Sequence, residues 1–166
     1  MSKLTRVVLS AIFSLCIFGA AYAGTVGSTL DVSTNVVAAC SVTTSPVVIP
    51  DYDSTASVVG TGSIDVNCTS GAAYNIALDG GAYFLPSPQR RLSDDGTNFL
   101  NYSLWTDDTF TEMWGDAGFG DTTPYPTVAD VGTGIVQPHP VPGAVPLGQT
   151  VPFGAYSDIV NVTIHY

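Results

Sequence analysis

Apolar and polar residues alternate along much of this chain, which is the pattern of half-buried β-strands. The last strand predicted in this way has an apolar face made of Val160, Val162, Ile164 and Tyr166. Asn, Thr and His residues lie between them and form its polar face. The same alternation occurs over residues 64–68 and 74–78, and no segment has the apolar spacing of a helix. The pattern predicts an all-β chain.

Turn-forming Gly, Pro, Asn and Asp residues separate these runs. Residues 70–72 predict a hairpin between the two runs just named. Residues 100–106 predict a further strand, and Met113 and Trp114 predict the start or end of a short one. Many short strands without helices indicate an antiparallel β-sandwich.

The stretch from residue 117 to residue 146 is rich in Gly, Pro, Asp and Thr, and it predicts strands near 134–137 and 145–147 with turns between them. Pro138, Pro140 and Pro142 alternate within it. Proline has no N–H to donate to a β-ladder, so these residues predict an edge or a loop and argue against a central strand.

Residues 1–23 have the three parts of a secretory signal peptide. Lys3 and Arg6 give a positive start, an apolar run follows, and Ala21-Tyr22-Ala23 is a cleavage sequence. The alternative is an uncleaved membrane anchor, but the apolar run is short for a membrane span. We therefore expect export and exclude residues 1–23 from the fold.

The remaining chain has the length of one domain and is strongly acidic. Arg90 and Arg91 are its only Lys or Arg residues, against 14 acidic residues. Such a charge repels nucleic acids and anionic lipids. Binding to nucleic acid is excluded on this ground.

Cysteine usage agrees with export. Signal-peptide cleavage leaves Cys40 and Cys68, and an even pair in an oxidising compartment predicts a disulfide. A metal or redox pair would need a C-x-x-C spacing or clustered His and Cys residues, which the sequence lacks. Both cysteines lie on the apolar side of their strands, so the bridge is expected in the core, with a stabilisation of about 3–4 kcal/mol.

Residues 24–39 form a long, amphipathic, β-prone segment that begins at the free end of the processed chain. Its apolar face includes Val26, Leu30 and Val32. Sixteen extended residues span about 50 Å. The segment could be one long first strand, or a strand given to another subunit, and the residues alone leave both interpretations open.

Candidate chemistry is sparse. His139 lies between two prolines and His165 lies on a polar strand face, so both are expected to be exposed, without an orienting partner. Trp105, Trp114 and Tyr102 could form a sugar-binding platform, but core or subunit packing is the preferred interpretation. We expect no catalytic, cofactor or metal site, and no enzyme activity.

Several motifs, in this order, carry a resemblance to a known family. They are Cys40-Ser41-Val42, Gly62 to Thr69, Tyr74 to Asp79, Arg90-Arg91-Leu92, Leu100 to Thr106, Trp114-Gly115-Asp116, Gly132-Thr133-Gly134, Gly148-Gln149, Val151 to Asp158 and Val160 to Ile164. In these motifs the chain resembles the spore coat protein U domain family, which includes the major subunits of archaic (Csu-type) chaperone-usher pili.

The resemblance implies an incomplete immunoglobulin-like β-sandwich over residues 40–166 that lacks its last strand. It implies that residues 24–39 are a donor strand running into the first strand, with Val26, Leu30 and Val32 as its inserting residues. It also implies that Cys40 pairs with Cys68. The groove would be bordered by the final-strand residues Val160, Val162, Ile164 and Tyr166.

The resemblance further implies a structural pilus subunit that supports surface adhesion and biofilm formation. Its partners would be a periplasmic pilus chaperone, an outer-membrane usher, and identical or related pilin subunits. The subunit would be exported through the periplasm to a cell-surface pilus. The alternatives are a spore coat or outer-layer protein, a tip adhesin of the same pilus and, more distantly, a secreted hydrolase.

Overall fold

The computed structural model describes residues 23–85, 89–116 and 127–166. The chain divides into two units, residues 1–35 and 36–166. The predicted signal peptide lies outside the described residues, apart from Ala23. Among the described residues, no helix is long and apolar enough to cross a membrane.

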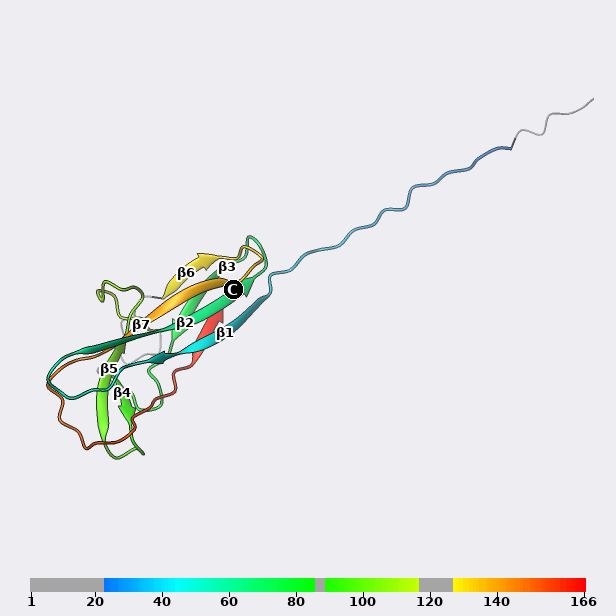
Figure 1. Cartoon of the computed structure of the whole chain (residues 1–166). Helices are drawn as coiled ribbons and strands as arrows, with labels where there is room; N and C mark the ends of the chain where they lie inside the picture. The colour runs from blue at the N-terminus through cyan, green and yellow to red at the C-terminus, as the bar shows by residue number, and fades with distance from the viewer. Residues whose placement is uncertain (1–22, 86–88, 117–126) are drawn as a thin grey trace, which may run out of the picture. The chain divides into compact units, whose positions relative to one another are not determined.

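Within the described residues, eight strands form two antiparallel sheets, which confirms the all-β prediction (Figure 1). The five-stranded sheet has the order β1-β2-β7-β5-β4 and the three-stranded sheet the order β6-β3-β8. The strands are β1 (Cys40–Val48), β2 (Val58–Cys68), β3 (Ala73–Leu78), β4 (Arg90–Ser93), β5 (Phe99–Leu104), β6 (Val128–Val131), β7 (Gln137–Val145) and β8 (Val162–His165).

The core lies between the two sheets and follows the predicted alternation. In β2 and β3 the inward residues are buried and most of their neighbours are not. Each large apolar side chain buried in this way stabilises the fold by about 1.5–3 kcal/mol. The most deeply buried apolar residues are Ile64, Val66, Cys68, Tyr74, Ile76, Ala77, Leu78, Trp114 and Val145.

The predicted hairpin at residues 70–72 is wrong, because β2 and β3 lie in different sheets. The connection is a tight turn that crosses from one sheet to the other. Gly71 has a φ of 85°, and its N–H donates to the carbonyl of Gly132 at 2.8 Å. Alternation within two runs does not reveal whether the runs pair with each other, so the sequence pattern could not separate the two connections.

The expectation for the proline-rich stretch is also wrong: it forms β7, between β2 and β5. Backbone groups of successive residues in an antiparallel strand point alternately to the two neighbouring strands. The carbonyl of Pro142 accepts a hydrogen bond from the N–H of Trp105, so the backbone of Pro142 points to the β5 side. Pro138 and Pro140 lie at alternate positions and point the same way. The N–H groups that these prolines lack would therefore have faced β5. β5 meets β7 only near the C-terminal end of β7 among the described strands. The missing N–H groups of the prolines therefore cost the ladder between β2 and β7 no hydrogen bonds.

Met113 and Trp114 form no strand, only an isolated bridge between Met113 and Trp105. Instead this segment closes one flank of the sandwich. The Trp114 backbone N–H donates to Leu104 of β5, and its indole N–H donates to Ile76 of β3, both at 2.9 Å. Trp114 is fully buried. One internal segment thus joins the two sheets.

The buried guanidinium of Arg90 completes this sealed flank. It donates to the carbonyls of Trp114 at 2.7 Å, of Leu78 at 3.0 Å and of Asp79 at 2.9 Å. Burial lowers the pKa of Arg90 to about 10, so the group keeps its charge at neutral pH. A charged donor satisfies the carbonyls of three loop and strand residues that would otherwise be buried without partners.

Candidate functional site

The flank between β1 and β8 is open and carries a groove, whose smaller part has a mostly apolar lining. A smaller hollow of about 250 Å³ lies between β1 and the start of β8. A larger hollow of about 690 Å³ lies beyond it, towards the C-terminal segment 149–158. The two hollows share Val47, Ile49, Leu92 and Asp158, so they adjoin along this flank. We call the two hollows together the open groove.

Glycines in the five-stranded sheet place the β1 wall of the open groove. The register of β1 against β2 shifts between Ser45 and Val48. A Cβ atom on Gly60 would lie 2.1 Å from the carbonyl oxygen of Val48, and one on Gly143 would lie 2.7 Å from the Val47 side chain. The bulged end of β1 can lie close against the sheet only because these side chains are absent. Val47 is thereby held against the groove.

The opposite wall is fixed by the carboxylate of Asp158, which precedes β8. Its Oδ1 accepts from the N–H groups of Ala82 at 2.9 Å and Ile159 at 2.8 Å. Its Oδ2 accepts from the hydroxyl of Tyr102 at 2.7 Å. Burial raises the pKa of Tyr102, which keeps the hydroxyl protonated as a donor. Gly81, with a φ of 82°, leaves room for the carboxylate.

The predicted final strand borders the open groove as β8. It pairs with β3, and among the described residues no strand pairs with its outer edge or with that of β1. Val160 and Val162 line the groove, and Ile164 packs against the core. Tyr166 follows the end of β8 and is 64% exposed.

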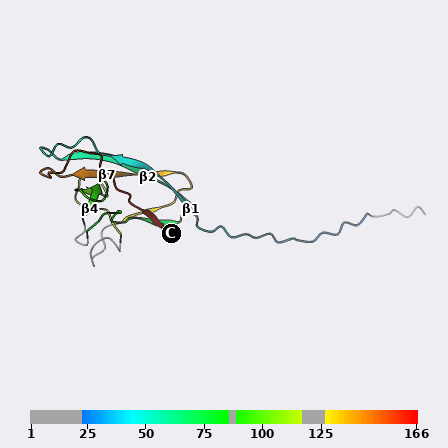
Figure 2. The same cartoon turned by 90° about the horizontal axis from the view of Figure 1, so that it is seen from below.

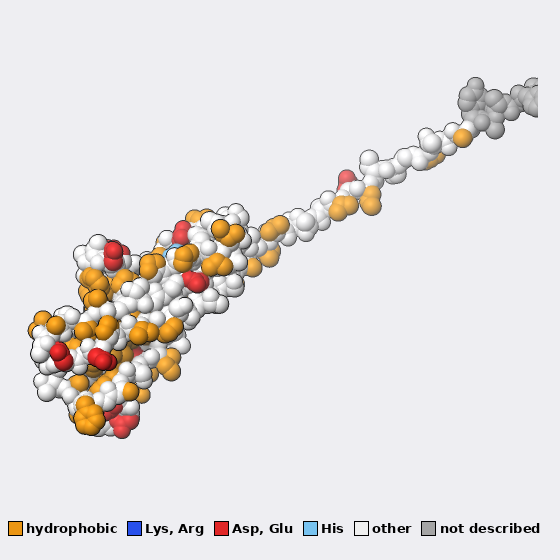
Figure 3. Space-filling model, viewed as in Figure 1, with side chains coloured by type: hydrophobic (Ala, Val, Ile, Leu, Met, Phe, Trp, Pro, Cys, Tyr) orange, Lys and Arg blue, Asp and Glu red, His pale blue; other side chains and the backbone are white. Residues whose placement is uncertain are grey.

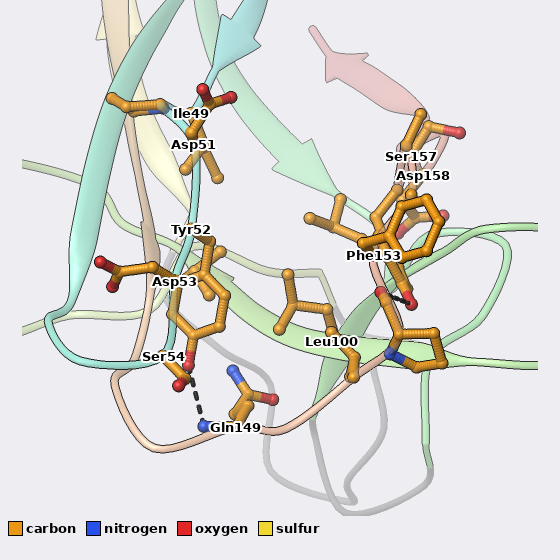
Figure 4. Close-up of a pocket in the computed structure, with 18 of the residues that line it drawn as sticks. Ile49, Asp51, Tyr52, Asp53, Ser54, Leu100, Gln149, Phe153, Ser157 and Asp158 are labelled. Atoms are coloured by element: carbon orange, nitrogen blue, oxygen red, sulfur yellow. Dashed lines mark hydrogen bonds between the residues drawn. The ribbon is translucent and has the colours of Figure 1, made fainter.

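The larger hollow has an aromatic rim that the sequence did not predict (Figure 4). Tyr52 accepts from the N–H of Gln149 at 2.8 Å and donates to the carbonyl of Pro146 at 3.0 Å. Leu100 lies on the floor, and Phe153 on the far rim is completely exposed. The rim therefore adds aromatic side chains to the polar and apolar lining of the larger hollow.

Apolar side chains also gather on the outer surface of the sandwich and recur along the N-terminal segment (Figure 3). Residues 23–35 are extended without assigned strand structure, and all are exposed. Val26 is 100% exposed, and Leu30 and Val32 are each 87% exposed. The donor role of these three residues stays a prediction.

The structure contains the disulfide between Cys40 and Cys68. These residues face each other as register partners, at the start of β1 and the end of β2. Thr69 adds hydrogen bonds beside the bridge, because its hydroxyl accepts from the N–H of Ala39 at 3.1 Å and its N–H donates to the carbonyl of Ala39 at 2.9 Å. The point where the N-terminal segment joins the sandwich is therefore fastened both covalently and by hydrogen bonds.

The expectation of an exposed His139 without a partner is wrong. Its side chain is 12% exposed, and its Nε2 lies 2.9 Å from the hydroxyl of Tyr74 and 3.9 Å from a carboxylate oxygen of Asp130. Burial lowers the pKa of His139. The three residues come from β7, β3 and β6, so they link the two sheets. Sequence reasoning missed this contact because it depends on which strands face each other.

The aromatic residues that were candidates for a binding platform pack within the fold instead. Trp114 and Tyr102 are buried, so they form no exposed sugar-binding platform with Trp105. His165 is exposed, as expected. Within the described part of the chain, no group of three or more His, Cys, Asp or Glu residues is placed to hold a metal ion. The open groove is the feature with the clearest capacity to bind.

Comparison with known proteins identifies the family. The family model of the Spore Coat Protein U domain matches residues 26–163. The chain belongs to the Spore Coat Protein U domain family. Within the family, it is 33% identical to Protein U of Myxococcus xanthus over 99% of this chain and 98% of that protein.

The fold of this family member is also similar to a solved structure of a pilus assembly complex. That structure is the CsuC-CsuE chaperone-tip adhesion subunit pre-assembly complex from the archaic chaperone-usher Csu pili of Acinetobacter baumannii. The TM-score is 0.56 at 18% identity, over 79% of this chain. The match spans 40% of the solved chain, so this comparison concerns the fold alone.

Proposed function

We propose that this Spore Coat Protein U family member is a structural pilus subunit that polymerises by donor-strand exchange. Residues 24–39 of one copy would enter the open groove of the next copy. The observation that carries the proposal is the open groove itself, which has an apolar floor and two strand edges without described partners. The same chain carries an exposed segment with the alternation of a strand.

β-Augmentation is the physical mode of this contact. Residues 24–39 would donate and accept main-chain hydrogen bonds along β8, while alternate side chains enter the groove. Val26, Leu30 and Val32 are large apolar side chains on the inserting face. Such pairing covers both the exposed apolar groove and the open sheet edge, which are otherwise liable to aggregate.

The geometry favours a donor strand that runs antiparallel to β8. The end of β8 pairs near the start of β3, at the pole where Cys40 and Cys68 lie, while the larger hollow lies at the start of β8. If the donor strand runs antiparallel to β8, the domain that follows it would lie beside the larger hollow of the acceptor. The N-terminal segment of the acceptor itself leaves from the other pole, beside Cys40 and Cys68. Repetition of that contact gives an open filament.

Before assembly, a periplasmic chaperone would fill the groove, and an outer-membrane usher would exchange it for the next subunit. The subunit would then be exported to the cell surface, where the pilus supports adhesion and biofilm formation. The similarity to a chaperone-bound pilus fold supports this path. The identity with Protein U over nearly the whole chain favours a second candidate, a spore coat or outer-layer protein joined by the same strand contact.

Deletion of residues 24–31 tests the proposal. The processed chain should form fibres, while the deleted chain should remain a monomer or a chaperone complex in electron microscopy and size-exclusion chromatography. The point variant Leu30→Asp should also block assembly, because it puts a charge into an apolar groove. Thr29→Asp on the opposite face is the matched control and should assemble. Normal fibres from the deleted chain would refute donor-strand polymerisation.

A further inference from the structure

The strand that continues the N-terminal segment is also a wall of the open groove. β1 begins at Cys40 directly after the segment, and its residues 44–47 line the smaller hollow. β1 is the edge strand of its sheet and pairs regularly with β2 from Cys40 to Ser45 before the register shifts. A pull on the N-terminal segment therefore acts first on the strand that shapes the binding site.

β2 is held far more firmly than β1. It lies between β1 and β7, and its residues Val58–Val66 face Gln137–Val145 in continuous register. Its inward residues are buried in the core. Removing β2 requires loss of two ladders and of core packing, while removing β1 requires loss of one edge ladder.

We propose that the disulfide between Cys40 and Cys68 is a tension anchor, which passes a pull on the N-terminal segment to β2 and so keeps the β1 wall of the groove in place. The inference rests on the proposed function, since a donated segment is what would carry tension between subunits. The bridge joins the first residue of β1 to the last residue of β2. Tension that reaches Cys40 therefore has a covalent path into β2, an interior strand of the sheet.

Thr69 is the second element of the anchor. It bonds to both backbone groups of Ala39, and its hydroxyl also donates to the carbonyl of Val37 at 3.4 Å. Without the disulfide, these hydrogen bonds would be the first to resist the pull. Thr69 therefore matters little while the bridge is intact and more once it is lost.

If the disulfide acted only by closing a loop of the unfolded chain, a disulfide between two other residues would stabilise the fold as well. The relocated pair Val59→Cys and Ala144→Cys separates the two roles. These residues are register partners in β2 and β7, and Val59 is 54% exposed. The new bridge restores a cross-link to the chain while leaving β1 without an anchor.

The test is single-molecule force spectroscopy of the processed full chain, held at its two ends, and of its fibres. Without Cys40 and Cys68 (both changed to Ser), the chain should show an early step in which β1 separates, and fibres should break sooner under constant force. The relocated bridge in this background should recover thermal stability but neither mechanical property. Selective reduction of assembled wild-type fibres repeats the test should the Ser variant fail to fold.

Thr69→Val should shorten the lifetime under force roughly tenfold in the double-Ser background and have little effect in the wild type. Thr43→Val, on an exposed position of β1, is the matched control. Recovery of the wild-type lifetime by the relocated bridge would overturn the anchor. A wild-type chain that forms no fibres would refute the proposed function, while the end-held chain would still report on the anchor.

Discussion

The two flanks of the sandwich are closed in different ways. On one flank the chain's own Trp114 lies between the sheets, with both its backbone and indole N–H groups bonded. On the other flank, between β1 and β8, a groove remains and the described residues supply no closing strand. β1 and the red strand β8 near the C-terminus belong to different sheets (Figure 2). The contrast shows that this fold can close a flank with a segment of its own chain. The open flank between β1 and β8 is therefore not a general consequence of the fold.

The flanks also differ in how backbone groups are satisfied. Arg90 donates to three carbonyls beside Trp114, so these backbone groups of the sealed flank have a partner within the chain. The outer edges of β1 and β8 offer a row of backbone donors and acceptors to another chain. Damage to the sealed flank should therefore affect folding, and damage to the open flank should affect association.

The largest effect is expected from Trp114→Ala. Removal of a fully buried indole should lower the free energy of unfolding by about 3–5 kcal/mol, because a cavity forms and two strands lose a shared contact. Urea unfolding of the processed chain measures the change. Trp105→Ala, at a half-buried position, should cost clearly less. Equal losses would show that the Trp114 segment does not seal the flank.

A charge placed in the open groove should act on association instead. Val162→Lys should weaken binding of a synthetic peptide of residues 24–39 by roughly a hundredfold, about 2.7 kcal/mol, because Val162 lines the groove. Thr163→Lys, its exposed neighbour on β8, should leave binding nearly unchanged. Fluorescence titration measures both affinities. Equal weakening by the two variants would place the peptide elsewhere.

The smallest effect concerns the contact between the sheets at His139. Burial lowers the pKa of this ring, so the folded chain favours its neutral form. As the pH falls below about 6.5, the ordinary His value, the unfolded chain binds the proton more readily and the fold loses stability. The loss should stop growing below the folded pKa. His139→Gln should remove this part of the pH profile of thermal unfolding, and an unchanged profile would contradict it.

Acidic side chains provide an internal control for that profile. Hydrogen bonds from Asn98 lower the pKa of Asp94 to about 2, and those from Thr55 lower the pKa of Asp53. Their contribution is present above the ordinary Asp value and is lost only as the pH falls further. The His139 and Asp effects therefore occupy different pH ranges.

Local patterns predicted the strands whose two faces differ most. The alternation in β2, β3 and β8 reflects burial of one face, and it located Val162 and the Cys40 partner Cys68. The alternation of apolar and polar residues did not reveal that the prolines of β7 face β5, which pairs with only a short part of β7. It also did not reveal which strands share a sheet, because pairing depends on contacts between residues distant in sequence.

The family resemblance implied a groove beside the final strand, and the strand pattern alone indicated neither the groove nor its extent. The final strand marked its border, while the wall near Val47 and the rim at Tyr52 and Phe153 depend on where β1 bulges and where the C-terminal segment lies. Gly60 and Gly62, alternating in a strand, were the available signal for close backbone approach. Hydrogen-bond partners such as Tyr74 and His139 needed the full register of both sheets.

Hydrogen exchange of the processed chain before and after assembly tests the central claim most directly. Amides of residues 24–39 and of β8 should become protected together in the fibre, because they would form one new ladder between copies. Fibres in which residues 24–39 exchange as fast as in the free chain would contradict donor-strand exchange through the open groove.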